Sequence, residues 1–327
     1  MRTASMLKKK TKQSILHAHA LTAYKAARYD PTRTTSLRNA FARDCRKRFA
    51  HLCRVITKSI VDEDCFAMAP GSGGFAAHVD MATTGRLAFD YPRSADKVNE
   101  FMKWLQKQID AGIMEVTTAR QIGRAVEDVW ANKYVTTAYQ KGIIRARQEM
   151  LGKGYDVPKI GDASALFTAF NQPFHLDRVG LVYSRVYSEL RGITALMDTQ
   201  ISRVLAQGMA DGDNPRVLAK LLTKTITGPV GDLSLTDTLG RFIPAERRAE
   251  TLARTEIIKA HHEATIQEYR NYGVEGVSVE VEWFTAGDDR VCDECSSMEG
   301  QTFSLDEIEG MIPVHPNCRC CAIAIPA

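Results

Sequence analysis

The sequence predicts a mostly α-helical N-terminal and middle region, followed by a small α+β, zinc-stabilised C-terminal domain. Through most of the first 272 residues, apolar residues recur at three- and four-residue spacing, as on one face of an α-helix. Beyond residue 276 the period changes to alternation, which indicates a half-buried strand, and five of the eight cysteines follow it. With 327 residues, 44% of them hydrophobic, the chain has a globular composition and the length of about two domains.

Residues 1–60 form a basic segment that we expect to be a partly helical arm. They contain fifteen Lys/Arg residues and two acids, a net charge of +13, whereas the rest of the chain carries −9. This asymmetry favours a polyanion or an acidic protein surface as partner, and a solvated tail is the alternative that charge leaves open. Double-stranded DNA would be bound through its phosphates, without base recognition. The candidate nucleic-acid-binding residues are Lys8, Lys9, Lys10, Lys12, Arg43, Arg46, Lys47 and Arg48.

Helical spacing continues from this arm into residues 61–160, which we predict to be a helical region with a glycine-rich linker near residues 69–74. The stretch from 122 to 154 is predicted to be one long helix. We interpret its aromatic residues as packing groups rather than a platform for stacking bases. The apolar stripe expected in the arm consists of Leu37, Phe41, Cys45, Phe49, Leu52 and Ile56. A second stripe consists of Val98, Met102, Leu105 and Ile109, and the aromatic residues are Trp130, Tyr134 and Tyr139.

Residues 161–327 contain three further predicted helices, at 177–215, 216–226 and 243–273. The first two flank the turn "ADGDNP", which resembles a helix-turn-helix arrangement. The second helix is mostly apolar with few base-reading residues, so we predict ordinary helix packing instead. The alternating stretch "VSVEVEWF" then predicts a strand directly before the cysteines.

The C-terminal cysteines have the spacing of metal ligands. Cys292 and Cys295 form a C-x2-C pair, and "HPNCRC" supplies His315, Cys318 and Cys320. Zinc binds four N or S ligands tetrahedrally, so four of these five residues suffice, and the choice between His315 and Cys320 stays open. The chain has no apolar run of ~20 residues and no export signal, so we expect a reducing compartment and no membrane partner. Disulfides or thioredoxin-like redox chemistry are less satisfactory alternatives, because neither explains both cysteine clusters.

Two catalytic interpretations compete with a structural zinc site. A nucleobase deaminase has H-x-E followed by P-C-x-x-C, and His261 and Glu263 nominally provide the first part. However, Val291 rather than proline precedes Cys292, and His261 lies in the middle of a predicted helix. The Glu280-x-Glu282 pair, as in ADP-ribosyltransferases, is explained more simply by an exposed strand face. A zinc ion with four protein ligands has no open position, so we predict no enzymatic activity, with a zinc-containing DNA-acting enzyme or toxin as the alternative.

Three segments together resemble the phage head-morphogenesis family, the minor head proteins similar to protein F of phage Mu. They are "LARTEIIKAHHEATIQEYRNYG", "EWFTAGDDRVCDECSSMEGQTFSLDEIEG" and "IPVHPNCRC". The resemblance lies in the order and spacing of an A-R-T-E helix, a tryptophan strand, D-x-R-x-C-x-x-C and H-P-N-C-R-C. It marks residues 161–327 as a head-morphogenesis-like domain with a C-terminal zinc-knuckle subdomain at 274–327. Cys321, beside the last cysteine of the pattern, is a departure from it.

The resemblance implies a structural component of a tailed-phage virion. Members of this family are associated with the portal vertex and the capsid interior, and handle DNA during assembly, packaging or ejection. The expected partners are therefore the portal protein, the major capsid or scaffold protein, and double-stranded DNA bound by charge. The expected location is the virion, with the host cytoplasm during assembly.

Overall fold

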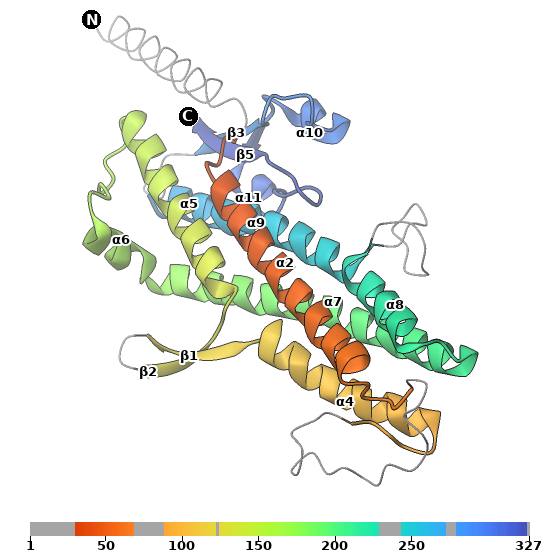
Figure 1. The fold of residues 1–327 in the computed structure, drawn as a ribbon. Helices are drawn as coiled ribbons and strands as arrows, with labels where there is room; N and C mark the ends of the chain where they lie inside the picture. Colours follow the sequence, from red (N-terminus) through yellow and green to blue (C-terminus); the bar gives the residue numbers. More distant parts are fainter. Residues whose placement is uncertain (1–29, 69–87, 122–123, 229–242, 273–278, 326–327) are drawn as a thin grey trace, which may run out of the picture. The chain divides into compact units, whose positions relative to one another are not determined.

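The computed structural model describes residues 30–68, 88–121, 124–228, 243–272 and 279–325 (Figure 1). The predicted fold class is confirmed: the chain is mostly helical, with a small sheet near the C-terminus. It divides into two compact units, each built from segments far apart in the sequence rather than from contiguous ranges. We call them the sheet unit (Met1–Phe41, Ala131–Val186 and Ala253–Ala327) and the hairpin unit (Ala42–Trp130 and Tyr187–Leu252).

The apolar stripe predicted in the basic arm forms one side of helix α2 (Thr35–Thr57). Phe41, Cys45, Phe49, Leu52 and Ile56 are buried, whereas Leu37 is half-buried. The helix continues into a short π-helix η1 (Lys58–Asp62). Residues 35–57 are thus part of the folded protein. Lys8, Lys9, Lys10 and Lys12, and the glycine-rich linker near 69–74, lie outside the described residues.

The second predicted stripe is also confirmed. Helix α4 (Ser94–Gly112) buries Val98, Leu105 and Ile109, together with Phe101. Met102 is half-buried, because Phe101 rather than Met102 lies at the centre of the buried side. The hairpin unit also contains helix α8 (Pro215–Thr227), which begins with an Asn214 cap: its side chain accepts a hydrogen bond from the Val217 amide.

The predicted long helix from residue 122 is wrong in its first part. Strands β1 (Val116–Gln121) and β2 (Arg124–Val129) form an antiparallel hairpin, and helix α5 (Asn132–Gly152) begins only after it. The β-branched run Val116-Thr117-Thr118 favours strand β1, because β-branched residues lose rotamer freedom in a helix, and the pairing of residues 124–129 with β1 draws them out of the predicted helix. The aromatic residues after the hairpin are confirmed as packing groups, since Trp130, Tyr134 and Tyr139 are at most 9% exposed.

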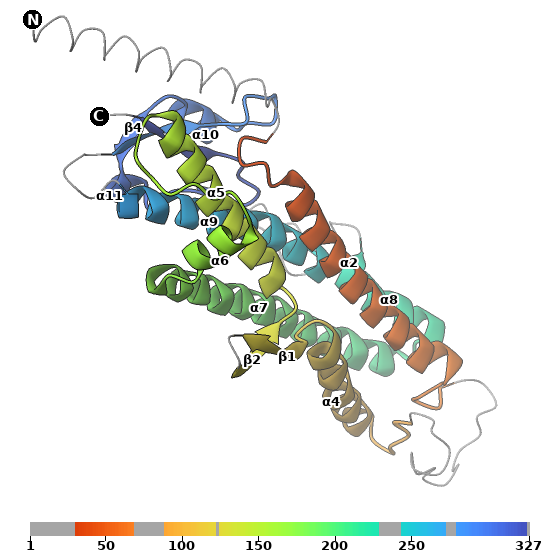
Figure 2. The ribbon, with the colours of Figure 1, turned by 90° about the vertical axis from the view of Figure 1, so that its left-hand side faces the viewer.

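In the sheet unit, α5 crosses helix α9 (Ala245–Tyr272) at very close range (Figure 2). A Cβ atom at Gly142 would lie 2.4 Å from the carbonyl oxygen of His261 and 2.7 Å from the Cβ of Ala264. Only glycine therefore allows the two backbones to approach this closely. The Oγ1 of Thr265 also donates a hydrogen bond to the carbonyl of His261, within α9. Helices α6 (Ala163–Phe170) and α7 (Pro173–Asp211) also contribute residues to this unit.

The small sheet has the order β4-β3-β5, with both pairs antiparallel. Its central strand β3 (Glu280–Phe284) is the predicted alternating strand, and β4 (Thr302–Ser304) and β5 (Cys321–Ile325) flank it. Short helices α10 (Asp293–Met298) and α11 (Leu305–Ile308) lie in the connections. Trp283 of β3 is fully buried, in one core with Met150 of α5 and Tyr269 of α9. The sheet thus shares its apolar core with two long helices.

No helix in the described ranges combines the length and the apolar character that crossing a membrane requires.

Candidate metal centre

The first pair of candidate ligands lies at the start of α10. Cys292 is the N-cap of this helix, and its Sγ accepts a hydrogen bond from the backbone amide of Cys295 at 3.4 Å. This turn brings both sulfur atoms to the same side of the chain. Cys292 is exposed, whereas Cys295 is 3% exposed and belongs to the core shared with Trp283.

The second arm of the site is the loop that leads into β5. The Cys318 amide donates to the carbonyl of His315, and Asn317 between them has a left-handed backbone with φ of 62°. Asparagine tolerates this conformation better than most residues. The Asn317 amide also donates to the Oγ1 of Thr255 on α9 at 3.1 Å. Helix α9 therefore fixes the loop that presents His315 and Cys318.

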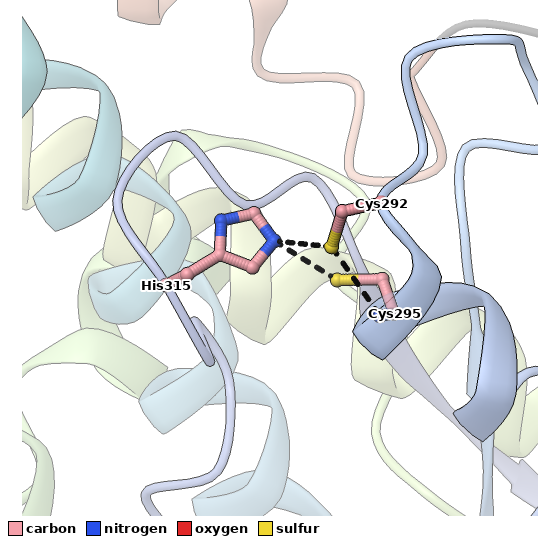
Figure 3. Close-up of side chains that lie close together, drawn as sticks. All are labelled: Cys292, Cys295 and His315. Atoms are coloured by element: carbon pink, nitrogen blue, oxygen red, sulfur yellow. Dashed lines mark hydrogen bonds between the residues drawn. The ribbon is translucent and has the colours of Figure 1, made fainter. Parts of the chain in front are cut away.

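The pairing of β3 with β5 brings the two arms together, and Figure 3 shows His315 facing both cysteines of the first arm. The Nε2 of His315 lies 3.2 Å from the Sγ of Cys292 and 3.1 Å from that of Cys295. The sulfur atoms of Cys295 and Cys318 are 4.0 Å apart. Neighbouring ligand atoms of a tetrahedral zinc ion are roughly 3.5–3.8 Å apart, given metal–ligand bonds of about 2.0–2.3 Å. The spacing therefore suits ligands of a single ion.

The donor atoms form two overlapping groups that share Cys295. Within each group, all ligand atoms lie within 4.8 Å of one another, and either group could hold a metal ion. The groups are Cys292, Cys295 and His315, and Cys295, Cys318 and Cys320. All five residues predicted from the sequence are thus brought together. No cysteine of the chain is in a disulfide, since all eight lie in described ranges and are free thiols.

The tautomer of His315 favours metal binding. Its Nδ1 lies 2.9 Å from the carbonyl oxygen of Pro316, which can only accept a hydrogen bond. In the neutral ring the proton is therefore on Nδ1, and the lone pair of Nε2 faces Cys292 and Cys295. A carbonyl that orients a histidine in this way is a common outer partner of metal ligands.

The thiols cannot all ionise without a cation. A hydrogen bond from the Cys320 thiol lowers the pKa of Cys318 to about 5, and the Cys295 amide lowers the pKa of Cys292. Burial raises the pKa of Cys295 to about 12, and the hydrogen bond to Cys318 raises the pKa of Cys320. One thiolate thus keeps its neighbours protonated. A divalent ion would replace these protons, so metal binding would release protons.

An ion pair that the sequence did not predict joins the two arms. The carboxylate of Asp288 accepts hydrogen bonds from both Nη atoms of Arg319, at 2.7 and 2.5 Å, and from Arg290 at 3.0 Å. Because Arg319 lies between Cys318 and Cys320, this bidentate pair holds the second arm against the segment before Cys292. The D-x-R and C-R-C patterns contain both partners, but only the fold shows that they meet.

The remaining candidate residues lie apart from the metal centre. His261, which the deaminase interpretation would use, and its neighbour His262 are buried in α9 and belong to neither group of metal ligands among the described residues. Cys321 is buried on the other side of its strand, where its sulfur accepts a hydrogen bond from Arg145 at 3.3 Å. Cys321, which departs from the family pattern, therefore belongs to neither group of candidate metal ligands.

The four candidate nucleic-acid-binding residues that the structure describes are of two kinds. Arg46 pairs with Glu250 at 2.7 Å, and Arg48 pairs with Glu115 at 2.8 Å while stacking over Trp130. Arg43 and Lys47 are exposed. Two of the four are thus engaged in ion pairs of the fold.

A comparison with protein families matches residues 199–323 to the family described as phage Mu protein F like protein. The match begins within α7 and ends in β5, so it includes α8, α9, the three-stranded sheet and all five candidate ligands. The resemblance predicted from the sequence is confirmed over this part of the chain. Neither a curated protein nor a solved structure matches the chain.

Proposed function

We propose that this chain is a minor head protein of a tailed phage, with a structural role in head morphogenesis. The match of residues 199–323 to phage Mu protein F like proteins carries the proposal. In this role the protein enters the virion at the portal vertex or in the capsid interior, after assembly in the host cytoplasm. Its partners are the portal protein and the major capsid or scaffold protein. The role requires positioning and adhesion rather than catalysis.

Within this proposal the metal centre holds a structural Zn²⁺. The donors are three thiols and an imidazole, which suit zinc, and the chain of contacts from Cys292 through His315 and Cys295 to Cys318 gives four ligands. Cys320 lies beside this set as a fourth thiol and is the fifth candidate ligand. Four protein ligands leave no position for water or substrate, which is the property of a structural site.

The exposed side of α2 is the proposed contact for DNA. Arg43, Lys47, His51 and Arg54 recur at helical spacing and are all exposed, on the side opposite the buried stripe. A rise of 1.5 Å per residue makes this row roughly 17 Å long. Together with the basic residues of the first 29 positions, the row would neutralise phosphates without reading bases. Arg46 and Arg48, engaged in ion pairs, contribute less to this surface.

Incorporation into particles tests the structural role. The full chain is expressed during phage assembly as the wild type and as Cys292→Ser, with Cys53→Ser as control because Cys53 lies far from the metal ligands in sequence and contacts Thr227. We expect purified particles to contain the wild type and Cys53→Ser but to lose Cys292→Ser. Absence of the wild-type protein from particles would contradict the proposal.

The salt dependence of binding tests the DNA contact. Deleting residues 1–60 would remove α2 and its buried stripe, so substitutions are preferable. Changing Arg43, Lys47 and Arg54 together to Gln should reduce the slope of log K against log salt by about 3, at roughly 0.9 for each phosphate contact. The matched control changes three exposed lysines outside α2 to Gln: Lys107, Lys159 and Lys220. Equal slopes in the two triple variants would exclude α2 as the contact.

A further inference from the structure

The sheet unit also contains a cationic pocket, and its charged lining residues lie far in sequence from the cysteine motifs. It has a volume of about 450 Å³ and lies between one side of α5, the loop before α2 and strand β5. Ile144 and Ile323 form an apolar part of the pocket wall. Arg33, Lys141, Arg145 and Lys153 line it with positive charge, against a single lining carboxylate, that of Glu149.

Glu149 does not balance these charges, because other groups already engage it. One of its oxygens accepts a hydrogen bond from the Nε of Arg145 at 2.7 Å, and the other accepts from the hydroxyl of Tyr269. The Nη2 of Arg145 donates in turn to the carbonyl of Ala322 at 3.0 Å. Arg145 and Glu149 thus form an internal ion pair of the pocket wall. The charges of Arg33, Lys141 and Lys153 remain in excess.

Lys153 is the side chain that most requires a partner. Its Nζ is buried and makes no hydrogen bond with any described residue. Burial lowers its pKa to about 8, although Glu149 and Glu282 oppose this shift, so the amine is still mostly charged at neutral pH. A buried ammonium without a hydrogen-bond partner is costly. An anion in the pocket would remove this cost.

We propose that this pocket binds a phosphate monoester carried by a nucleotide. Arginine and lysine are the side chains that recognise phosphate, and the volume exceeds what a lone phosphate needs, leaving room beside Ile144 and Ile323 for an apolar or aromatic portion. The phosphate can belong to a free nucleotide or to the 5′ end of a nucleic-acid strand. Residues 1–29 contain no acidic residue, so they offer no side-chain carboxylate as an internal occupant. The inference does not depend on the proposed virion role.

Calorimetric titration of the full chain tests it, with adenosine 5′-monophosphate as probe and adenosine as the control that lacks the phosphate. We expect the monophosphate to bind and adenosine not to bind. Lys153→Met should weaken binding by about tenfold or more, because a charge-assisted hydrogen bond is lost. Lys159→Gln, an exposed lysine of the same unit outside this pocket, should leave affinity unchanged. If Lys153→Met does not fold, Lys141→Gln serves as the second variant, since Lys141 is only half-buried.

Two short single strands, one with a 5′-phosphate and one with a 5′-hydroxyl, distinguish the sources of the ligand. Tighter binding of the phosphorylated strand, lost in Lys153→Met, assigns the pocket to strand ends. Equal binding of both strands, with the monophosphate still bound, assigns it to free nucleotides. The inference is overturned if the monophosphate does not bind the wild type, or if it binds Lys153→Met and Lys141→Gln as tightly as the wild type.

Discussion

His315 and Cys320 compete for the fourth position of the proposed zinc site, and their geometry separates them. The Nε2 of His315 contacts both thiols of the first arm, while its Nδ1 is held by the Pro316 carbonyl. We therefore expect His315→Ala to lose most of the bound zinc and Cys320→Ser to retain it. Zinc per chain, measured by atomic emission after dialysis against a weak chelator, checks this. Retention by His315→Ala and loss by Cys320→Ser would assign the site to four cysteines.

Asp288 gives the two arms of the metal centre a pH-dependent link. The hydrogen bonds from Arg319 hold the pKa of this carboxyl well below its usual range. A lowered folded-state pKa means that the ion pair stabilises the arms fully above about pH 4, the ordinary pKa of aspartate, and is lost only at lower pH. Asp288→Asn should therefore make the loop that presents His315 and Cys318 more susceptible to proteolysis at pH 7. Asp289→Asn, the exposed neighbour, should not, and equal protection of both variants would show that the ion pair is dispensable.

At the scale of helices, the crossing of α5 and α9 depends on Gly142. An added methyl group would lie 2.4 Å from a backbone oxygen, which cannot rotate away as a side chain could. We expect Gly142→Ala to lower the free energy of unfolding by about 1–3 kcal/mol, as overpacking in a core does. Gly180→Ala in α7 is the matched control, since no atom lies within 4 Å of its added Cβ. That change should be neutral or stabilising by roughly 0.5–1 kcal/mol. Urea unfolding of both variants measures the difference, and equal stabilities would contradict a close crossing.

Elements whose signal is local could be predicted from the sequence. The stripes of α2 and α4 follow from periodicity alone, and the C-x2-C turn places two thiols together within a few residues. The β1–β2 hairpin was missed because the helical spacing downstream outweighed a short β-branched run at 116–118. The contact between Asp288 and Arg319 depends on β3 pairing with β5, which local pattern does not reveal. Likewise, Lys153 becomes notable only when the fold buries it without a partner.

At the scale of the whole sheet unit, the proposed zinc is one of several stabilising features. The sequence predicts a small C-terminal domain that zinc stabilises. In the structure, however, Trp283 and the buried thiols share a core with residues of α5 and α9. Loss of the proposed metal would therefore weaken the closure of the two arms, while the apolar contacts of the sheet with the helices would persist. Substitution of a metal ligand should therefore affect the closure of the arms more than the stability of the sheet unit.

The stability of this unit should also fall in mild acid, because α9 buries two neutral histidines. Burial lowers the pKa of His262 to about 4 and that of His261 well below its usual value. An unfolded histidine titrates near pH 6.5, so below that pH the unfolded chain binds more protons than the folded one. The stabilisation is complete above about pH 6.5 and declines as pH falls. At pH 4 the titration of His262 alone has lowered the free energy of unfolding by about 3 kcal/mol. His262→Gln, which can still donate to the Ile308 carbonyl that His262 contacts at 3.2 Å, removes this titration. Urea unfolding of the wild type and the variant between pH 7 and pH 4 should therefore show a shallower pH dependence for the variant, and parallel curves would contradict a neutral buried His262.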